Sequence, residues 1–142
     1  MSEEEREDLA SKHVPKLLEL GSRYLPDFDF SDGIPLRSEL IDIVRAKWLL
    51  DNSPDRPDYS DVVSGTGYLF GRLLEENFRM QWCIAEDSNG EFISLVRFRS
   101  DLADTDKEIS IPPFSYVEKR KDLQNAEVFQ DGLAEFSKLF AD

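Results

Sequence analysis

The segment from Val62 to Gly71 contains no charged residue, and any fold of this chain has to enclose it. Small and apolar residues recur there at helical spacing, at Val63, Gly67, Gly71, Leu74 and Phe78. Val62, Leu69 and Leu73 add a second apolar stripe, and Ser60 or Asp61 can cap the first turn. Because a helix that is apolar around most of its circumference is normally buried, the pattern predicts a buried central helix over 61–78.

The glycines of this helix need a physical reason, because glycine costs about 1 kcal/mol relative to alanine in a helix interior. Gly67 and Gly71 lie four residues apart and leave one stripe of the helix without side chains. We expect another element to approach closely there. Trp82, on a strand opposite this helix, is large enough to fill the space. The sequence therefore predicts structural roles for Gly67, Gly71 and Trp82.

Alternating apolar residues after the central helix predict a small antiparallel sheet. Strands are expected over 80–86 and 91–99, with the turn at Asn89-Gly90, a strong hairpin signal in which Gly90 has a structural role. Met80, Trp82 and Ile84 should share one face of the first strand. A short third strand, 109–111, is expected to end at Pro112 and Pro113.

Residues 1–60 are predicted to be mainly helical, and acidic residues 3–8 suit the positive end of the first helix dipole. An interior proline removes a hydrogen-bond donor and clashes with the preceding turn. Pro15 therefore predicts either a kink or a break near His13, and the preferred interpretation is a short acidic first helix followed by a second helical piece over 15–24. A further helix is expected over 36–50, with Pro35 at its first position.

The C-terminal part is predicted to contain one or two helical turns after Pro113 and an amphipathic helix over 126–140. This last helix and the central one should cover one face of the sheet. The expected fold is α+β: a small antiparallel three-stranded meander packed against several helices, with a helical N-terminal part. A length of 142 residues suits a single domain, with 1–60 as the helical part and 61–142 as the α+β core.

Cysteine usage and the N-terminal residues indicate a cytoplasmic protein. Cys83 is the single cysteine, which favours a reducing compartment over secretion. The first residues lack the basic and apolar regions of a signal peptide, and no run reaches the roughly 18 apolar residues of a membrane span. We therefore expect a soluble, intracellular chain.

The formal net charge is −13, from 30 acidic and 17 basic residues. Phosphate contacts require lysine and arginine, and no basic stripe is present, so nucleic acids and anionic membranes are unfavourable partners. A basic protein is the natural complement, because an acidic field attracts it over a long range. The alternative is that the charge serves solubility alone.

Two acidic loops, 51–61 and 101–106, are the predicted surfaces for such a partner. Tyr59 is the expected anchor, since a rigid aromatic residue among polar ones is typical of interfaces. The candidate partner-binding residues are Asp51, Asp55, Asp58, Tyr59, Asp61, Asp101, Asp104 and Asp106.

The sequence contains no recognisable catalytic constellation. The glycine spacing of the central helix is not that of a dinucleotide-binding fingerprint, and there is no phosphate-binding loop. His13, the single histidine, is expected at a helix boundary, far from a nucleophile. Neighbouring carboxylates such as Glu75 and Glu76 point apart on a helix. The prediction is a non-enzymatic protein without cofactor or metal, with a carboxylate-dependent enzyme or metal-binding protein as the alternative.

Several short motifs carry a resemblance to a known family. They are Gly67-x-x-x-Gly71, Met80-x-Trp82, an acidic pair followed by Gly90, and Pro113-x-x-x-Val117-x-Lys119-Arg120. With them, the segment of about 65–139 resembles the bacterial domain of unknown function 3806 family. The resemblance implies a bacterial cytosolic setting, and members look like immunity partners of secreted toxins. It implies an acidic module that neutralises a basic toxin; an uncharacterised housekeeping domain is the alternative.

Overall fold

The computed structural model describes residues 1–98, 108–122 and 124–140. Its elements are α1 (Glu3–Tyr24), α2 (Glu39–Leu50), α3 (Tyr59–Phe78), β1 (Gln81–Asp87), β2 (Gly90–Phe98), β3 (Glu108–Ile111), α4 (Pro113–Glu118) and α5 (Val128–Phe140). The predicted α+β fold is confirmed, with a three-stranded antiparallel sheet and a helical N-terminal part. Within these ranges, no helix combines the length and apolarity needed to cross a membrane.

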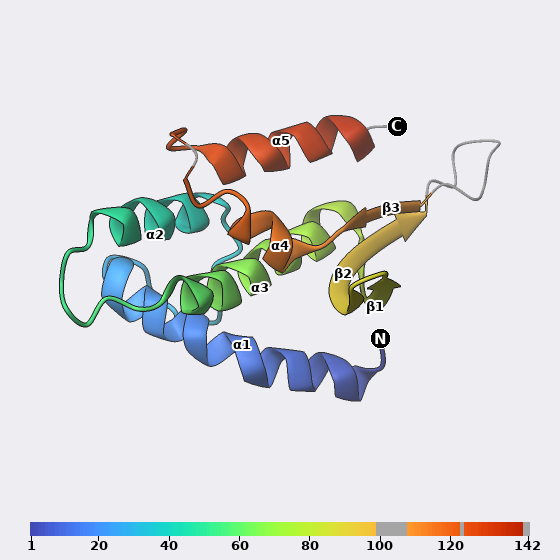
Figure 1. Cartoon of the computed structure of the whole chain (residues 1–142), viewed down its shortest axis with the longest axis horizontal. Coiled ribbons are helices and arrows are strands. Elements are labelled where there is room, and N and C mark those ends of the chain that lie inside the picture. Colours follow the sequence, from blue (N-terminus) through green and yellow to red (C-terminus); the bar gives the residue numbers. More distant parts are fainter. Residues whose placement is uncertain (99–107, 123, 141–142) are drawn as a thin grey trace.

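The central helix α3 is buried, as predicted. In Figure 1 it runs through the middle of the molecule, with α1 below, α2, α4 and α5 above, and the sheet at one end. It begins at Tyr59 rather than at 61, and Asp58, not Ser60 or Asp61, occupies the cap position. Arg79 ends the helix with a left-handed φ of 54°. Its buried residues are Val62, Gly65, Thr66, Gly67, Tyr68, Leu69, Phe70, Gly71, Leu73, Leu74 and Phe78.

The glycines of α3 lie where side chains or backbone of other elements press against the helix. A Cβ atom on Gly71 would overlap the ring of Trp82, and one on Gly67 would lie 2.5 Å from the ring of Phe114. A Cβ atom on Gly65 would lie 2.9 Å from the backbone nitrogen of Leu17 in α1. These distances are too short for a side chain, so the glycines permit the close approach of three other elements, α1, α4 and β1, to α3.

The sheet has the order β1-β2-β3 and packs its inner face against α3. Trp82, Leu95 and Ile111 lie directly opposite one another across the three strands, and all are buried. Trp82 also stacks on Tyr68 of α3, with ring centroids 5.8 Å apart. Ile84 is on the same face by strand alternation but is 46% exposed, and it lines a groove between the hairpin and α1.

The hairpin turn differs in detail from the predicted one. Asp87 pairs with Gly90, so Ser88 and Asn89 are the two turn residues. Gly90 follows them with φ of 112°, a value that favours glycine, and no described non-glycine residue of the turn has a positive φ. The Asp87 carboxylate accepts a hydrogen bond from the Asn89 backbone N–H at 2.8 Å. This side-chain turn and Gly90 together set the hairpin.

The helix α1 is continuous through Pro15, so the predicted break is wrong. The proline leaves the carbonyl of Ser11 without its helical donor, but both residues are exposed and water can replace that bond. Ser2 and Glu5 form a capping box that fixes the start of the helix. His13 is consequently in the helix interior rather than at a boundary.

Two further boundaries and one packing prediction need correction. The helix α2 begins at Glu39 rather than at 36, because the chain from Pro35 still turns, with the Arg37 N–H donating to the Pro35 carbonyl at 3.1 Å. The helix α5 begins at Val128 and packs mainly on α2 and through an aromatic cluster; it meets the sheet at its end, where the Phe140 ring lies 5.0 Å from the Arg97 guanidinium of β2. The cluster consists of Phe70, Tyr116, Phe129 and Phe136, with Phe70 and Tyr116 stacked at 4.7 Å.

A buried carboxylate anchors the start of α5. Asp42 of α2 accepts hydrogen bonds from the backbone N–H groups of Phe129 at 2.9 Å and Gln130 at 3.1 Å. These donors belong to the first turn of α5 and have no partner within that helix. Burial raises the pKa of Asp42, while the bonds from α5 act against that shift. Asp42 therefore serves as a cap supplied by another helix.

Candidate functional site

The aspartates predicted in the 51–61 loop lie together, but most of them are used within the molecule. Arg23 of α1 donates to Asp51 from Nε at 3.0 Å and from Nη2 at 2.8 Å. The same guanidinium reaches the Asp55 carboxylate at 3.2 and 3.3 Å. Asp61 forms an ion pair with Lys16 at 3.4 Å. Two cations of α1 thus form ion pairs with three of the four aspartates of this loop.

Asp51 is the most strongly held of these carboxylates. It accepts hydrogen bonds from the hydroxyl and backbone N–H of Ser53 and from the Tyr24 hydroxyl at 2.7 Å. These bonds and those from Arg23 hold the pKa of Asp51 well below its usual range. Such a carboxylate has a structural role, because its acceptor sites are already occupied. Asp58 differs, being exposed at the start of α3 without a capping hydrogen bond.

Tyr59 has internal contacts rather than those of an exposed anchor. Its ring packs against Trp48 with centroids 4.9 Å apart, and its hydroxyl donates to the Val117 carbonyl at 3.2 Å. Burial raises its pKa to about 12. These contacts connect the start of α3 to α2 and α4. The other predicted loop residues, Asp101, Asp104 and Asp106, lie outside the described residues.

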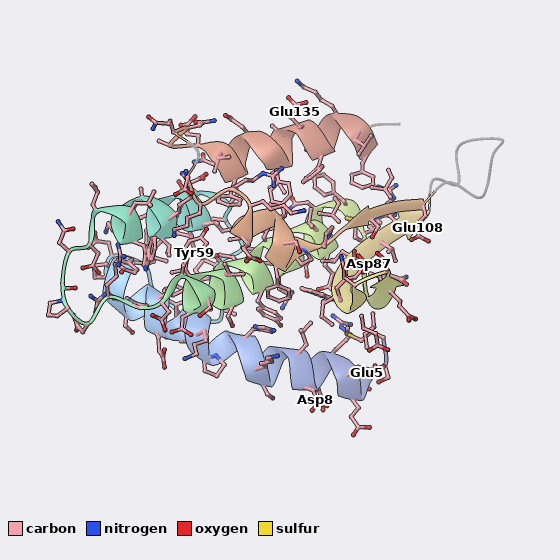
Figure 2. The ribbon with its side chains drawn as sticks, in the orientation of Figure 1. Glu5, Asp8, Tyr59, Asp87, Glu108 and Glu135 are labelled. Carbon is pink, nitrogen blue, oxygen red and sulfur yellow. The ribbon has the colours of Figure 1, made fainter. Side chains whose placement is uncertain are left out.

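Carboxylates without such partners gather at the opposite end of the molecule, beside the sheet. We call this set the acidic end; it consists of Glu3, Glu4, Glu7, Asp8, Glu86, Asp87, Glu91 and Glu108. All are exposed, and none forms an ion pair with a residue that the structure describes. Figure 2 shows Asp8, Asp87 and Glu108 on this side, away from Tyr59.

The acidic end includes a pair of like charges held at close range. Glu86 and Glu91 are direct cross-strand partners at the tip of the hairpin. By strand alternation they share a face with Ile84 and Ile93, which are the next inward-facing partners along the ladder. The hairpin therefore presents an apolar pair and then an acidic pair on the same face.

An apolar groove lies between α1 and this face of the hairpin. Its lining residues are Met1, Glu5, Asp8, Leu9, Lys12, His13, Ile84 and Ile93, and its volume is about 280 Å³. Leu9 is buried in its wall, whereas Ile84 is half exposed to the opening. Carboxylates occupy the α1 rim at Glu5 and Asp8, and Lys12 lies one turn further along. The groove and the acidic end are thus parts of one surface.

Sequence reasoning missed this site although its residues were visible. Residues 3–8 were predicted to favour a helix N-terminus, and the hairpin acids entered only as an acidic pair before Gly90. Their convergence depends on α1 being unbroken at Pro15, because only then do its first turns lie alongside β1. The exposure of Ile84 was the second missed signal, since alternation alone assigns it to the core.

His13 makes a contact that the sequence did not predict. Its Nδ1 lies 2.7 Å from the Ser64 hydroxyl of α3, and its ring packs on Phe114 at 4.4 Å. Burial, with a smaller contribution from Lys12, lowers its pKa to about 4. A nucleophilic serine needs a histidine oriented by a third group, and in the described part of the chain no carboxylate bonds this ring. The pair joins α1 to α3.

Other chemistry that the sequence left open finds little support among the described residues. They include no group of three His, Cys, Asp or Glu side chains placed to hold a metal. Glu75 forms ion pairs with Arg6 at 2.6 Å and Arg72 at 3.0 Å, so its charge is balanced. Burial raises the pKa of the Cys83 thiol, which keeps it protonated rather than nucleophilic.

The candidate site has two parts. Its components are an acidic end without described ion pairs and an apolar groove beside it. Comparisons of the chain add no relative to this description: no family model, no curated protein and no solved structure matches it.

Proposed function

We propose that this protein is a non-enzymatic module that binds a basic protein through the acidic end. The supporting observation is the distribution of unbalanced charge. The carboxylates of the first turns of α1 and of the hairpin are exposed without described ion pairs, whereas Asp51, Asp55 and Asp61 form ion pairs with Arg23 or Lys16. A surface attracts a cationic partner through charge that remains uncompensated.

The physical consequence of such a surface is faster association. Electrostatic steering can raise an association rate from about 10⁵–10⁶ M⁻¹s⁻¹ toward 10⁸ M⁻¹s⁻¹ at low salt. The effect weakens once the Debye length falls to about 8–10 Å, near physiological salt. The net charge of −13 adds to the attraction at long range. At short range, we expect the acidic end, rather than the 51–61 loop, to dominate the attraction of the partner.

A narrower proposal concerns the identity of the partner. The resemblance to the domain of unknown function 3806 family favours an immunity role, in which the chain neutralises a basic toxin in the bacterial cytoplasm. Binding by charge suits that role, because a toxin has to be captured quickly and held in an inactive complex. The partner would then carry a cationic surface at or near its own active site.

A carboxylate-dependent enzyme is the competing proposal, and the described carboxylates favour it less. A general acid needs a raised pKa and access to a cavity. Glu5 lines the groove, but its hydrogen bonds with Ser2 lower its pKa. Asp42 has a raised pKa, yet its oxygens are occupied by the start of α5.

The proposal is tested by capture followed by kinetics. The immobilised chain is exposed to the lysate of cells that carry its gene at about 50 mM salt, and the retained protein is identified and purified. Its association rate is then measured with two variants of equal charge change. One carries Glu4→Gln, Glu7→Gln and Asp8→Asn at the acidic end; the other carries Asp55→Asn, Asp58→Asn and Asp61→Asn.

We expect the first variant to slow association by about fivefold or more and the second by less than about twofold. Both differences should shrink at about 500 mM salt. Retention of no basic protein, or an association rate that neither variant changes, would contradict the proposal. A larger effect of the loop variant would assign binding to the 51–61 surface instead.

A further inference from the structure

We propose that the groove between α1 and the hairpin receives an aliphatic side chain from a lysine- or arginine-rich segment of the partner. This inference rests on the proposed function and specifies the partner's chemistry at that surface. It depends on the groove's lining, its size and the charges at its rim.

The groove offers apolar contact on both sides. Leu9 contributes from α1, and the cross-strand pair Ile84 and Ile93 contributes from the hairpin. Ile84 is 46% exposed, so apolar area here is left in contact with solvent. A volume of about 280 Å³ is slightly below the roughly 300–1,000 Å³ of drug-sized ligand sites. The space suits one side chain better than a whole small molecule.

The charges at the rim of the groove determine which residues can flank that side chain in the partner segment. Glu5 and Asp8 lie on the α1 side of the groove, and Glu86 and Glu91 continue the hairpin side on the same face. Two carboxylates directly opposite each other across strands repel, and a cation placed between them relieves that repulsion. Lys12 opposes these charges at the α1 side of the groove, and Lys119 lines a neighbouring depression with Asp87 and Glu91. The segment that fits is therefore cationic on both sides of its apolar residue.

The same charges disfavour other occupants. A second copy of this chain would bring its own acidic end against the first, at a net charge of −13 on each copy. An anionic membrane would be repelled in the same way. A cationic peptide segment is the occupant that the rim attracts rather than rejects.

The test uses two peptides of equal charge, KKKLKKK and KKKSKKK, and isothermal titration calorimetry at about 50 mM salt. Transfer of an aliphatic side chain into a half-open groove predicts that the leucine peptide binds about threefold to tenfold more tightly. Ile84→Ser should abolish this preference and leave the affinity of the serine peptide unchanged. Ile93→Ser is a second variant with the same expectation.

The matched control is Leu50→Ser, because Leu50 is 80% exposed at the end of α2 and lies outside the groove. It should retain the preference for leucine, and thermal unfolding should show all variants folded. The variant with Glu4→Gln, Glu7→Gln and Asp8→Asn should weaken both peptides alike.

The outcomes separate the inference from the function on which it rests. Equal affinity of the two peptides for the wild type, with both weakened by the charge variant, overturns the groove inference and leaves the proposed function standing. A leucine preference that survives Ile84→Ser and Ile93→Ser also overturns the groove inference. Failure of both peptides to bind at low salt overturns both.

Discussion

Glu86 of β1 and Glu91 of β2 are direct partners across the hairpin, on the face that carries Ile84 and Ile93. Like charges in this position destabilise a sheet by about 0.2–1 kcal/mol. The free protein carries that cost next to an exposed apolar pair. Binding of a cation there would remove this repulsion. The same pair of carboxylates therefore lowers the stability of the free protein and favours binding of a cationic partner.

The first prediction follows from that pair. Glu91→Gln removes the repulsion and should raise the free energy of unfolding by about 0.2–1 kcal/mol, measured by urea denaturation at low salt. Glu19→Gln removes one exposed charge of α1 and serves as the control, with a smaller expected change. If both substitutions change stability equally, the effect is one of net charge and not of the cross-strand pair.

The second prediction concerns the contact of α3 with the sheet. Gly71→Ala would place a methyl group against the Trp82 ring, which is buried and has little room to move. We expect a loss of about 1–3 kcal/mol in spite of the better helix propensity of alanine. Thermal and urea unfolding measure it.

Ser60→Ala, on an exposed position of the same helix, is the control for helix propensity and should change stability by less than about 0.5 kcal/mol. A Gly71→Ala protein as stable as the wild type would show that Trp82 can shift, and the packing role of Gly71 would then be wrong.

The third prediction is a pH dependence from His13, whose pKa in the folded protein is lowered to about 4 by burial. Well above pH 6.5, the ordinary pKa of histidine, the imidazole is neutral in both states, and stability is at its maximum with respect to this group. As the pH falls toward 4, the unfolded chain binds a proton that the folded chain does not. The free energy of unfolding should fall by up to about 3 kcal/mol over that window and then level off.

Comparison with His13→Gln isolates this contribution from that of the many carboxylates. Urea unfolding at pH 7 and pH 4.5 should give a smaller difference for the variant than for the wild type. The same pH difference in both proteins would mean that the imidazole titrates normally in the folded state.

The fourth prediction concerns the attachment of α5. Asp42→Ala leaves the backbone N–H groups of Phe129 and Gln130 without their acceptor, one of them buried, and should cost about 1–3 kcal/mol. Hydrogen exchange should accelerate first in α5. Glu135→Ala, which breaks the exposed pair with Lys138, should cost less than about 1 kcal/mol. Unchanged exchange in Asp42→Ala would mean that aromatic packing alone holds the helix.

The sequence was sufficient for those features that depend on local spacing. The central helix, the three strands and the buried Trp82 follow from periodicity, because burial of one face imposes that pattern. The break at Pro15 was wrong, because an exposed carbonyl at Ser11 can bond water instead of the missing donor. Local rules describe the cost of the proline but not the tertiary packing that outweighs it.

The candidate site was harder to derive because it depends on long-range partners. The 51–61 loop has the acidic composition expected of a binding surface. Three of its aspartates nevertheless form ion pairs with Arg23 or Lys16, which are far away in the sequence. No periodicity indicates which arginine will reach which carboxylate. The groove likewise arises where the first turns of α1 pass the hairpin, a relation set by the packing of α1 on α3 near Gly65.

The two tryptophans contact different parts of α3, its start and its middle, and this gives the molecule built-in optical reporters. Trp48 packs on Tyr59 at the start of the helix, and its indole nitrogen donates to the Pro57 carbonyl at 2.7 Å. Trp82 lies on Gly71, beside the first turns of α1. In a Trp48→Phe protein the remaining indole emission would come from Trp82 alone. Docking at the acidic end could then be followed by fluorescence without attaching a dye.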